Sequence, residues 1–144
     1  MGKKRVIKKT TSGVDHELRA RAVSRLPKKK LEKGILNILA TFNNTMLTLA
    51  DEKGNAVIWA SAGSLGFKGA RKGTPYAASK VAELVAEKAK MVGLKRVSIN
   101  VNGVGAGRES AVRSFLIHNI DLDTIRDVTP IPHNGPKPPK PRRV

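Results

Sequence analysis

The chain has 144 residues, of which 40% are hydrophobic, so it can form one domain with a sizeable core. Its formal net charge of +17 predicts a polyanionic partner, because self-repulsion on this scale is costly unless a ligand neutralises it. The sequence has no cysteine and only isolated histidines, so it predicts no disulfide, no metal site and no cofactor. It has no apolar run of the ~18 residues that cross a membrane, so it predicts no membrane partner.

The positive charge is concentrated at the two ends of the chain. Residues 1–33 carry 12 Lys and Arg against three acidic residues, and residues 130–144 carry four Lys and Arg with no acid. The middle of the chain is nearly balanced, with 12 basic and eight acidic side chains. This distribution predicts a basic N-terminal extension (1–33), a globular α/β domain (34–129) and a proline-rich basic C-terminal tail (130–144).

The N-terminal extension begins with a basic segment, residues 1–11, that has too little apolar content to fold alone. Asp15 can cap a short helix in which Leu18, Ala22 and Leu26 recur at four-residue spacing and which ends before Pro27. Three strands are predicted next, because branched and apolar residues dominate residues 35–41, 45–50 and 56–61. Short turns between them make antiparallel pairing the simplest arrangement.

Residues 61–73 combine glycines with Phe67, Lys68, Arg71 and Lys72. Glycine lets a backbone approach a ligand closely, cations neutralise phosphate, and an aromatic ring can stack on an unpaired base. This pattern favours contact with nucleic acid. The alternative is a flexible loop whose phenylalanine folds back onto the core.

Thr74-Pro75 predicts the start of a helix that ends at Gly93, and residues 97–101 alternate as a strand does. A turn containing Gly103, Gly105 and Gly107 follows, and Arg108 opens the next helix. Backbone N–H groups at such a helix start can hold a phosphate, with Arg108 beside them. The alternative is a strand-to-helix connection in which small residues are needed only for packing.

The chain closes with a short predicted strand, residues 124–128, and a tail with six prolines in its last sixteen residues. Proline at this density excludes helix and favours an extended arm. The tail lacks the apolar residues that would dock it on its own domain. A groove lined with phosphates would instead attract its cations, which are Lys137, Lys140, Arg142 and Arg143. The order β-β-β-α-β-α-β predicts a mixed sheet with helices packed against it.

The sequence resembles the bacterial-type small-subunit ribosomal protein family numbered eleven over residues 34–144. Four segments occur in the family's order: Phe42-Asn43-Asn44-Thr45, Gly66 to Lys72 with Thr74-Pro75 behind it, Gly103 to Ser110, and Asp127 to Gly135. Four positions depart from the family's usual pattern. Val104 and Ala106 stand where prolines are common, and Pro136-Lys137 replaces Cys-Arg.

The resemblance implies a three-layer α/β sandwich of ribonuclease H-like topology, with a five-stranded mixed sheet and extended basic N- and C-terminal arms. It implies a cytoplasmic protein on the platform of the ribosomal small subunit that bridges rRNA helices. It also implies a place near the cleft for the Shine-Dalgarno duplex of mRNA, beside the subunit's seventh and eighteenth proteins. By position, the resemblance assigns rRNA contact to Asn43, Asn44, Lys68, Arg71, Lys72, Arg108, His133, Asn134, Arg142 and Arg143.

Two other classes of function are compatible with parts of the sequence. A ribonuclease H-like nuclease needs several carboxylates that converge on two metal ions, but the predicted strands at 35–40 and 97–101 contain no Asp or Glu. A nonspecific, histone-like nucleic-acid-binding protein would account for the charge alone. We therefore expect a non-catalytic rRNA-binding protein without a small-molecule substrate.

Overall fold

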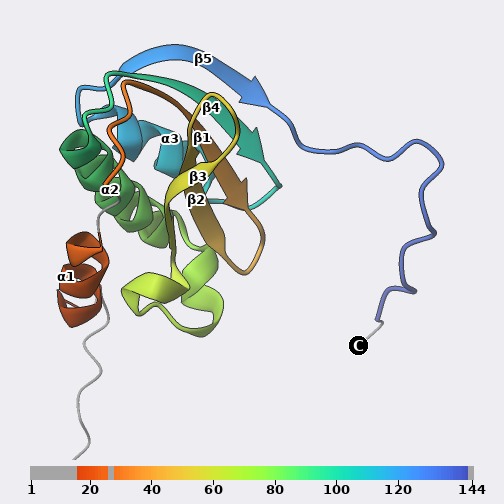
Figure 1. The fold of residues 1–144 in the computed structure, drawn as a ribbon. Coiled ribbons are helices and arrows are strands. Elements are labelled where there is room, and N and C mark those ends of the chain that lie inside the picture. Colours follow the sequence, from red (N-terminus) through yellow and green to blue (C-terminus); the bar gives the residue numbers. More distant parts are fainter. Residues whose placement is uncertain (1–15, 26–27, 143–144) are drawn as a thin grey trace, which may run out of the picture.

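A five-stranded mixed sheet with the strand order β3-β2-β1-β4-β5 organises the fold in the computed structural model (Figure 1). The structure describes residues 16–25 and 28–142. The strands are β1 (Lys33–Ala40), β2 (Thr45–Ala50), β3 (Ala56–Ser61), β4 (Arg96–Asn102) and β5 (Asp121–Asp127). The prediction of a mixed sheet is confirmed.

Strand direction follows the length of each connection. Short turns join β1 to β2 and β2 to β3, and both pairs are antiparallel, as predicted. Helices separate β3 from β4 and β4 from β5, and β4 runs parallel to both β1 and β5. Because parallel strands end at the same edge of a sheet, the segments that follow β1, β4 and β5 begin close together.

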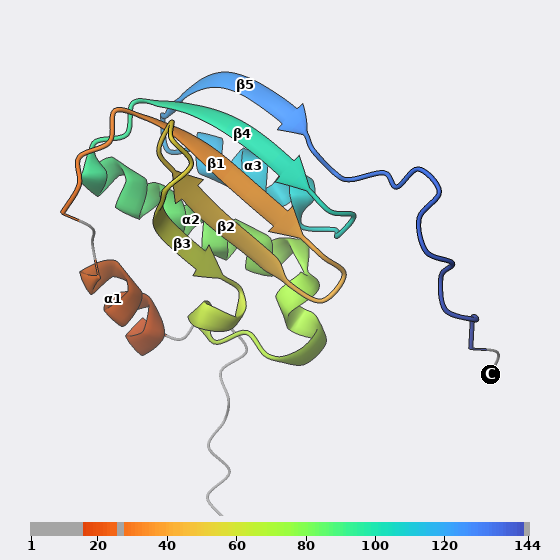
Figure 2. The same ribbon diagram turned by 45° about the vertical axis from the view of Figure 1, so that its right-hand side comes forward.

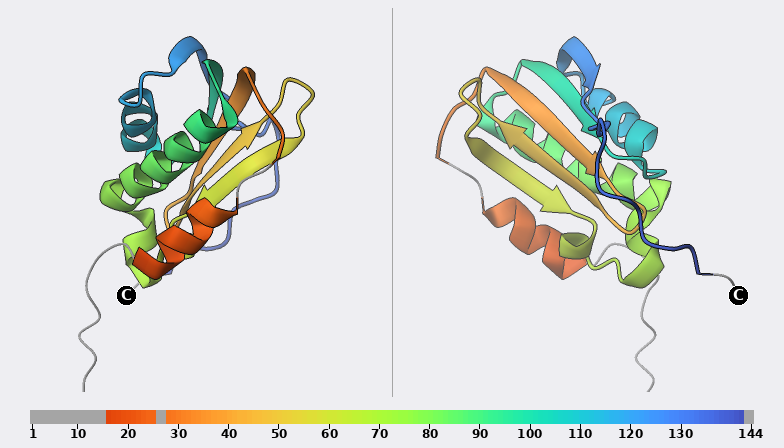
Figure 3. Two further views of the ribbon diagram at one scale, coloured as in Figure 1. Left: turned by 60° about the vertical axis from the view of Figure 1, so that its left-hand side comes forward. Right: turned by 90° about the vertical axis from the view of Figure 1, so that its right-hand side faces the viewer.

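Two helices, α2 (Pro75–Val92) and α3 (Arg108–Leu116), pack on one face of the sheet and against each other (Figure 3). The start of α2 is capped as the sequence predicts: the Thr74 hydroxyl accepts a hydrogen bond from the Ala77 N–H, and Pro75 occupies the first turn. Gly93, with φ of 89°, ends the helix in the left-handed conformation. The core lies between the buried side of α2 and the residues of β1, β2 and β4 that point towards it.

The opposite face of the sheet has no helical cover among the described residues (Figure 2). Asn37, Leu39, Met46 and Trp59 point to this face and are exposed. The described residues therefore form two layers, and the expected three-layer sandwich is wrong for this part of the chain. The inward residues of β1 to β4 are fully covered from one side, so a third layer is not needed to complete the core.

The first helix, α1 (His16–Ser24), lies beside β3 and α2. Its position is fixed by an ion pair between Arg19 and Glu87 of α2, with 2.5 Å between Nη2 and Oε1, and by Ala22 and Val23 against the core. Further along, Leu31 is buried in the core. The described part of the N-terminal extension thus packs on the domain, whereas residues 1–11, Asp15 and Leu26 lie outside the described residues.

Several predicted boundaries differ from the structure. β1 begins at Lys33 rather than residue 35, and β4 extends one residue further at each end than the predicted 97–101. β5 begins at Asp121, earlier than the predicted start at residue 124, because an exposed edge strand tolerates the acidic residues Asp121 and Asp123. The glycine-rich basic segment at 61–73, for which a flexible loop was the alternative interpretation, contains two 3-10 turns, η1 (Gly63–Leu65) and η2 (Gly69–Gly73). Across residues 16–25 and 28–142, no helix combines the length and apolarity that crossing a bilayer requires.

Candidate nucleic-acid interface

Four segments meet at the edge of the sheet where β1, β3, β4 and β5 end. They are the β1–β2 turn (41–44), the basic loop (62–74), the glycine turn (103–107) and the residues that lead into the C-terminal tail (128–129). We call this edge the loop edge. The site residues predicted from the sequence lie in these segments, directly beside them or in the tail itself, apart from Arg143, which is outside the described residues.

Glycines allow these segments to pack on one another with almost no space between backbones. A Cβ atom at Gly73 would lie 2.2 Å from the carbonyl oxygen of Phe42, so the basic loop rests directly on the β1–β2 turn. At Gly103 and Gly105 a Cβ would lie 2.1 and 2.3 Å from the carbonyl oxygens of Ala40 and Thr41. The loop edge is therefore one packed unit.

The glycine turn uses its own N–H groups internally. The Gly105 N–H donates to the Ala40 carbonyl at 2.8 Å, and the Gly103 N–H donates to the Thr129 hydroxyl at 3.2 Å. Glu109 adds a negative charge to the first turn of α3, which stabilises the helix but opposes an anion there. These contacts favour the packing interpretation of Gly103, Gly105 and Gly107 over a phosphate cradle.

Arg108 joins the start of α3 to the end of β5. Its guanidinium pairs with Asp127, with 2.5 Å between Nη2 and Oδ2, and it also donates to the Gly103 carbonyl and the Thr129 hydroxyl. Hydrogen bonds from the Thr129 hydroxyl and N–H, together with Arg108, lower the pKa of Asp127 to about 2. Arg108 thus holds the glycine turn next to Thr129, where the tail begins, and Asp127 largely neutralises its charge.

The basic loop presents its cations but not its aromatic ring. Lys68 and Arg71 are exposed, and Lys72 is half-buried with its stem near Gly63. Phe67 is only 7% exposed and meets Tyr76 edge to face, with 6.0 Å between ring centroids. The expectation that Phe67 stacks on a base is therefore wrong, because its ring fills the core beneath the loop. The alternative, a phenylalanine folded onto the core, holds.

An aromatic ring that the sequence analysis did not single out is better placed for stacking. Phe42, at the tip of the β1–β2 turn, is 78% exposed. The sequence signal for it was its position in a short turn beside two asparagines, outside the predicted strands. Of those asparagines, Asn43 is exposed, whereas Asn44 directs its Oδ1 into the protein, where that atom has no hydrogen-bond partner among the described residues.

The C-terminal tail extends from the loop edge along a path away from the domain (Figure 1). Residues 130–142 contain no helix or strand, and each of them is exposed. Asn134 has φ of 56°, which turns the chain once. The exposed site residues predicted in this segment are His133, Asn134, Lys137, Lys140 and Arg142.

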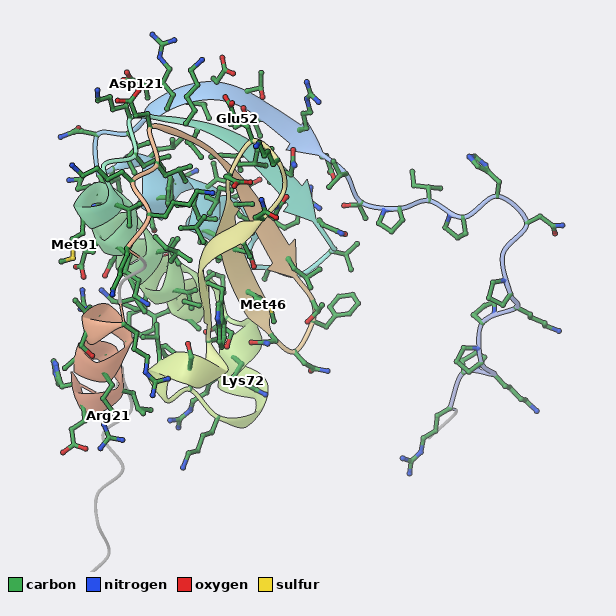
Figure 4. All side chains as sticks on the ribbon, viewed as in Figure 1. Arg21, Met46, Glu52, Lys72, Met91 and Asp121 are labelled. Carbon is green, nitrogen blue, oxygen red and sulfur yellow. The ribbon has the colours of Figure 1, made fainter. Side chains whose placement is uncertain are left out.

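Several acidic residues gather at the opposite edge of the sheet. Figure 4 shows Glu52 and Asp121 there, far from Lys72 at the loop edge. Asp51, in the β2–β3 turn, pairs with Lys29, with 2.6 Å between Oδ2 and Nζ. The Lys29 bond, with hydrogen bonds from the N–H and side chain of Asn55, holds the pKa of the Asp51 carboxyl well below its usual range. Within the described part of the chain, no group of three or more His, Asp or Glu residues is arranged to hold a metal ion.

Comparison with known proteins gives two findings. The family model for ribosomal protein S11 matches residues 34–143. Small ribosomal subunit protein uS11 of Solibacter usitatus (strain Ellin6076) is 54% identical over 117 residues, which cover 81% of this chain and 87% of the relative. Residues 16–33, including α1, precede the segment that the family model matches.

Proposed function

The chain belongs to the ribosomal protein S11 family, and on this basis we propose that it bridges helices of the small-subunit rRNA through its loop edge and C-terminal tail. As a family member it is a non-enzymatic ribosomal protein of the small subunit, where it binds rRNA and other ribosomal proteins and serves translation. The proposal concerns which of its surfaces does so and what that surface does.

The observation that carries the proposal is the convergence of exposed cations and a packed backbone at the loop edge. Lys68 and Arg71 project from a loop that Gly73 fixes on the β1–β2 turn. Because the backbone of this loop is already fixed, it loses little conformational entropy when its cations meet phosphates, so the loop can position an RNA backbone. Phe42, at the neighbouring tip, is available to stack on an unpaired base.

The two groups of predicted site residues then have different roles. We assign RNA contact to Asn43, Lys68, Arg71, Lys72 and the exposed residues of the tail. Gly103, Gly105, Gly107 and Arg108 position these contacts, because their backbones and charges are already engaged within the protein. The tail leaves from Thr129, whose hydroxyl contacts both Arg108 and Asp127, so its first residues start from a fixed point.

The finer placement in the ribosome is also part of the proposal. We place the protein in the cytoplasm, on the subunit platform, next to the seventh and eighteenth small-subunit proteins and near the Shine-Dalgarno cleft. We infer a ribonuclease H-like topology from the strand order β3-β2-β1-β4-β5 with β2 antiparallel to β1. The tail, with its prolines and cations, has the chemistry needed to enter a phosphate-lined groove between RNA helices.

Replacing Arg71 and Lys72 with alanine tests the proposal. We expect the R71A/K72A variant to bind structured small-subunit rRNA more weakly. The association constant should also depend less steeply on salt: the magnitude of the slope of its logarithm against log salt should be smaller by about 0.7 to 0.9 for each lost phosphate contact. The matched control is K53A/K90A, which removes the same charge from exposed positions outside the loop edge. Equal losses in the two variants would show that only net charge matters.

Competition between nucleic acids separates this function from nonspecific, histone-like binding. We expect the protein to prefer rRNA with loops and junctions over duplex DNA at equal salt, because a rigid set of cations matches one arrangement of phosphates better than a uniform duplex. Fluorescence anisotropy with a labelled rRNA fragment and unlabelled competitors gives the ratio. Equal affinity for the two competitors would contradict the proposal.

A further inference from the structure

A cleft of about 570 Å³ is lined by residues of α1, β3 and α2. Figure 3 shows how α1 lies beside these two elements. Arg21, Ala22 and Arg25 line it from the side of α1, and Val57 and Trp59 line it from β3. α1 precedes the segment that the family model matches, so the cleft exists because of the part of the chain that the resemblance does not explain.

Lys88 of α2 also lines this cleft and is only 6% exposed. It makes no hydrogen bond or ion pair with any other described residue, and the adjacent Glu87 is engaged by Arg19. Burial lowers the pKa of the Lys88 amine, because the charged form is poorly solvated there. Among the described residues, the buried side-chain polar atoms without a hydrogen-bond partner are Asn44 Oδ1 and Thr45 Oγ1, so the Lys88 Nζ is partly open to the cleft. An anion in the cleft would pair with this ammonium group.

The charge of the cleft indicates what kind of occupant it takes. Arg21 and Arg25 add two cations to Lys88, and none of the described residues that line the cleft is acidic. The chain's own N-terminal segment, residues 1–11, is itself basic, so like charges oppose its docking there. Trp59 also lines the cleft, at the edge strand β3, and is 61% exposed, so its indole is accessible to a ligand there.

We propose that this cleft binds one unpaired nucleotide of single-stranded RNA, with its phosphate on Lys88, Arg21 and Arg25 and its base against Trp59. Phosphate satisfies the cations, and a base has the planar face that stacks on an indole. The inference rests on the proposed function in taking the same class of ligand, but it uses residues that are separate from the loop edge. It gives the N-terminal extension a role in RNA binding beyond its net charge.

The fluorescence of Trp59 tests the proposal directly, because it is the chain's single tryptophan. We expect hexauridylate, titrated into the full-length protein at low salt, to quench this fluorescence. The K88M variant should weaken the quenching interaction about tenfold, as loss of one charge-assisted contact does. The control K90M removes the same charge from an exposed position two residues away and should leave the affinity within about twofold of the wild type.

A second measurement separates binding from folding. K88M should raise the free energy of unfolding of the free protein slightly, since it replaces a partly desolvated charge with an apolar side chain. Lower stability in K88M, or binding of hexauridylate without a change in Trp59 fluorescence, would overturn the proposal. Quenching by hexaglutamate but not by hexauridylate would overturn it in favour of an acidic protein partner.

The R71A/K72A variant keeps this test independent of the proposed function. We expect it to retain the quenching of Trp59 by hexauridylate, because Arg71 and Lys72 do not line the cleft. Loss of the quenching in R71A/K72A would place the hexauridylate site at the loop edge and overturn the cleft proposal. Failure of the loop-edge function would appear separately, as unchanged rRNA affinity in that variant.

Discussion

Gly105 is needed at the loop edge because the space around it leaves no room for a side chain. Its N–H donates to the Ala40 carbonyl, and its α-carbon lies so close to Thr41 that no Cβ fits. Glycine at this position is needed for backbone packing whether or not RNA is present. By contrast, Gly63 in the basic loop has space, because the nearest atom to an added Cβ is the Cδ of Lys72 at 3.8 Å.

We therefore expect Gly105→Ala to lower the free energy of unfolding by about 1–3 kcal/mol, the usual cost of forcing an atom into a packed site. Gly63→Ala is the matched control and should be close to neutral. Urea denaturation of both variants, without RNA, checks the difference. If Gly105→Ala kept full stability but bound RNA poorly, the turn would be a contact surface after all.

At the level of elements, the sequence was most informative where local chemistry alone determines structure. Thr74-Pro75 and Gly93 predicted both ends of α2. The residues of β2 and β3 were predicted correctly because both segments are rich in branched and apolar residues and are bounded by turn residues. β5 was predicted too short, because its position at the sheet edge, which permits acidic residues, is a property of the whole fold.

The same limit applies to the candidate site. The sequence identified the four segments of the loop edge, but the burial of Phe67 and the exposure of Phe42 depend on which residues lie beneath each loop. Arg108 was predicted as a free cation because Asp127, its partner, is distant in the sequence and approaches only through the parallel pairing of β4 and β5. Such long-range partners cannot be found from spacing alone.

The link between α3 and β5 predicts a pH dependence of stability. The pKa of Asp127 is about 2 in the folded protein and near the ordinary value of 3.8 when the chain is unfolded. A carboxyl whose pKa is depressed by folding stabilises the protein fully above its unfolded pKa, and this stabilisation is lost as the pH falls through the folded pKa. We expect Asp127→Asn to be less stable than wild type at pH 7, with a smaller difference near pH 2.

Asp121→Asn is the matched control for this prediction. Asp121 lies at the other end of β5, and its side chain makes no hydrogen bond or ion pair with the described residues. Circular dichroism during denaturation at pH 7, 4 and 2 gives the free energies to compare. A wild-type protein and an Asp127→Asn variant with parallel pH profiles would show that the Arg108–Asp127 pair contributes nothing to stability.

At the scale of the whole molecule, the net charge of +17 is distributed in a way that fits a protein surrounded by RNA. The edge of the sheet that carries the β2–β3 turn holds acidic residues together with lysines, and two of these lysines, Lys29 and Lys95, pair with Asp51 and Glu32. The described tail, by contrast, carries Lys137, Lys140 and Arg142 with no acidic residue. Counterions released from RNA phosphates are the main source of affinity for such a surface. If about 6 to 10 phosphates are contacted, affinity should fall by about 10³ to 10⁵ between 50 and 200 mM salt.

Removing the tail tests how much of this effect the extended segment supplies. Truncation after Thr129 keeps the contacts of that residue with Arg108 and Asp127 but removes Lys137, Lys140, Arg142 and Arg143. We expect the salt dependence to become less steep: the magnitude of the slope of the logarithm of the association constant against log salt should be smaller by about 3, since each lost contact accounts for about 0.7 to 0.9. The free energy of unfolding should stay the same, because the described tail residues beyond Pro130 are exposed and add nothing to the core.

A full-length variant with those four residues changed to glutamine separates charge from chain length. If phosphate contacts are the reason for the effect, this variant should match the truncation in salt slope while keeping the prolines that extend the tail. A variant that keeps the wild-type slope would mean that the tail binds through its backbone or its prolines. A truncation that unfolds the domain would mean instead that the tail packs on the protein's own surface, and the phosphate-lined groove would no longer be needed to explain its sequence.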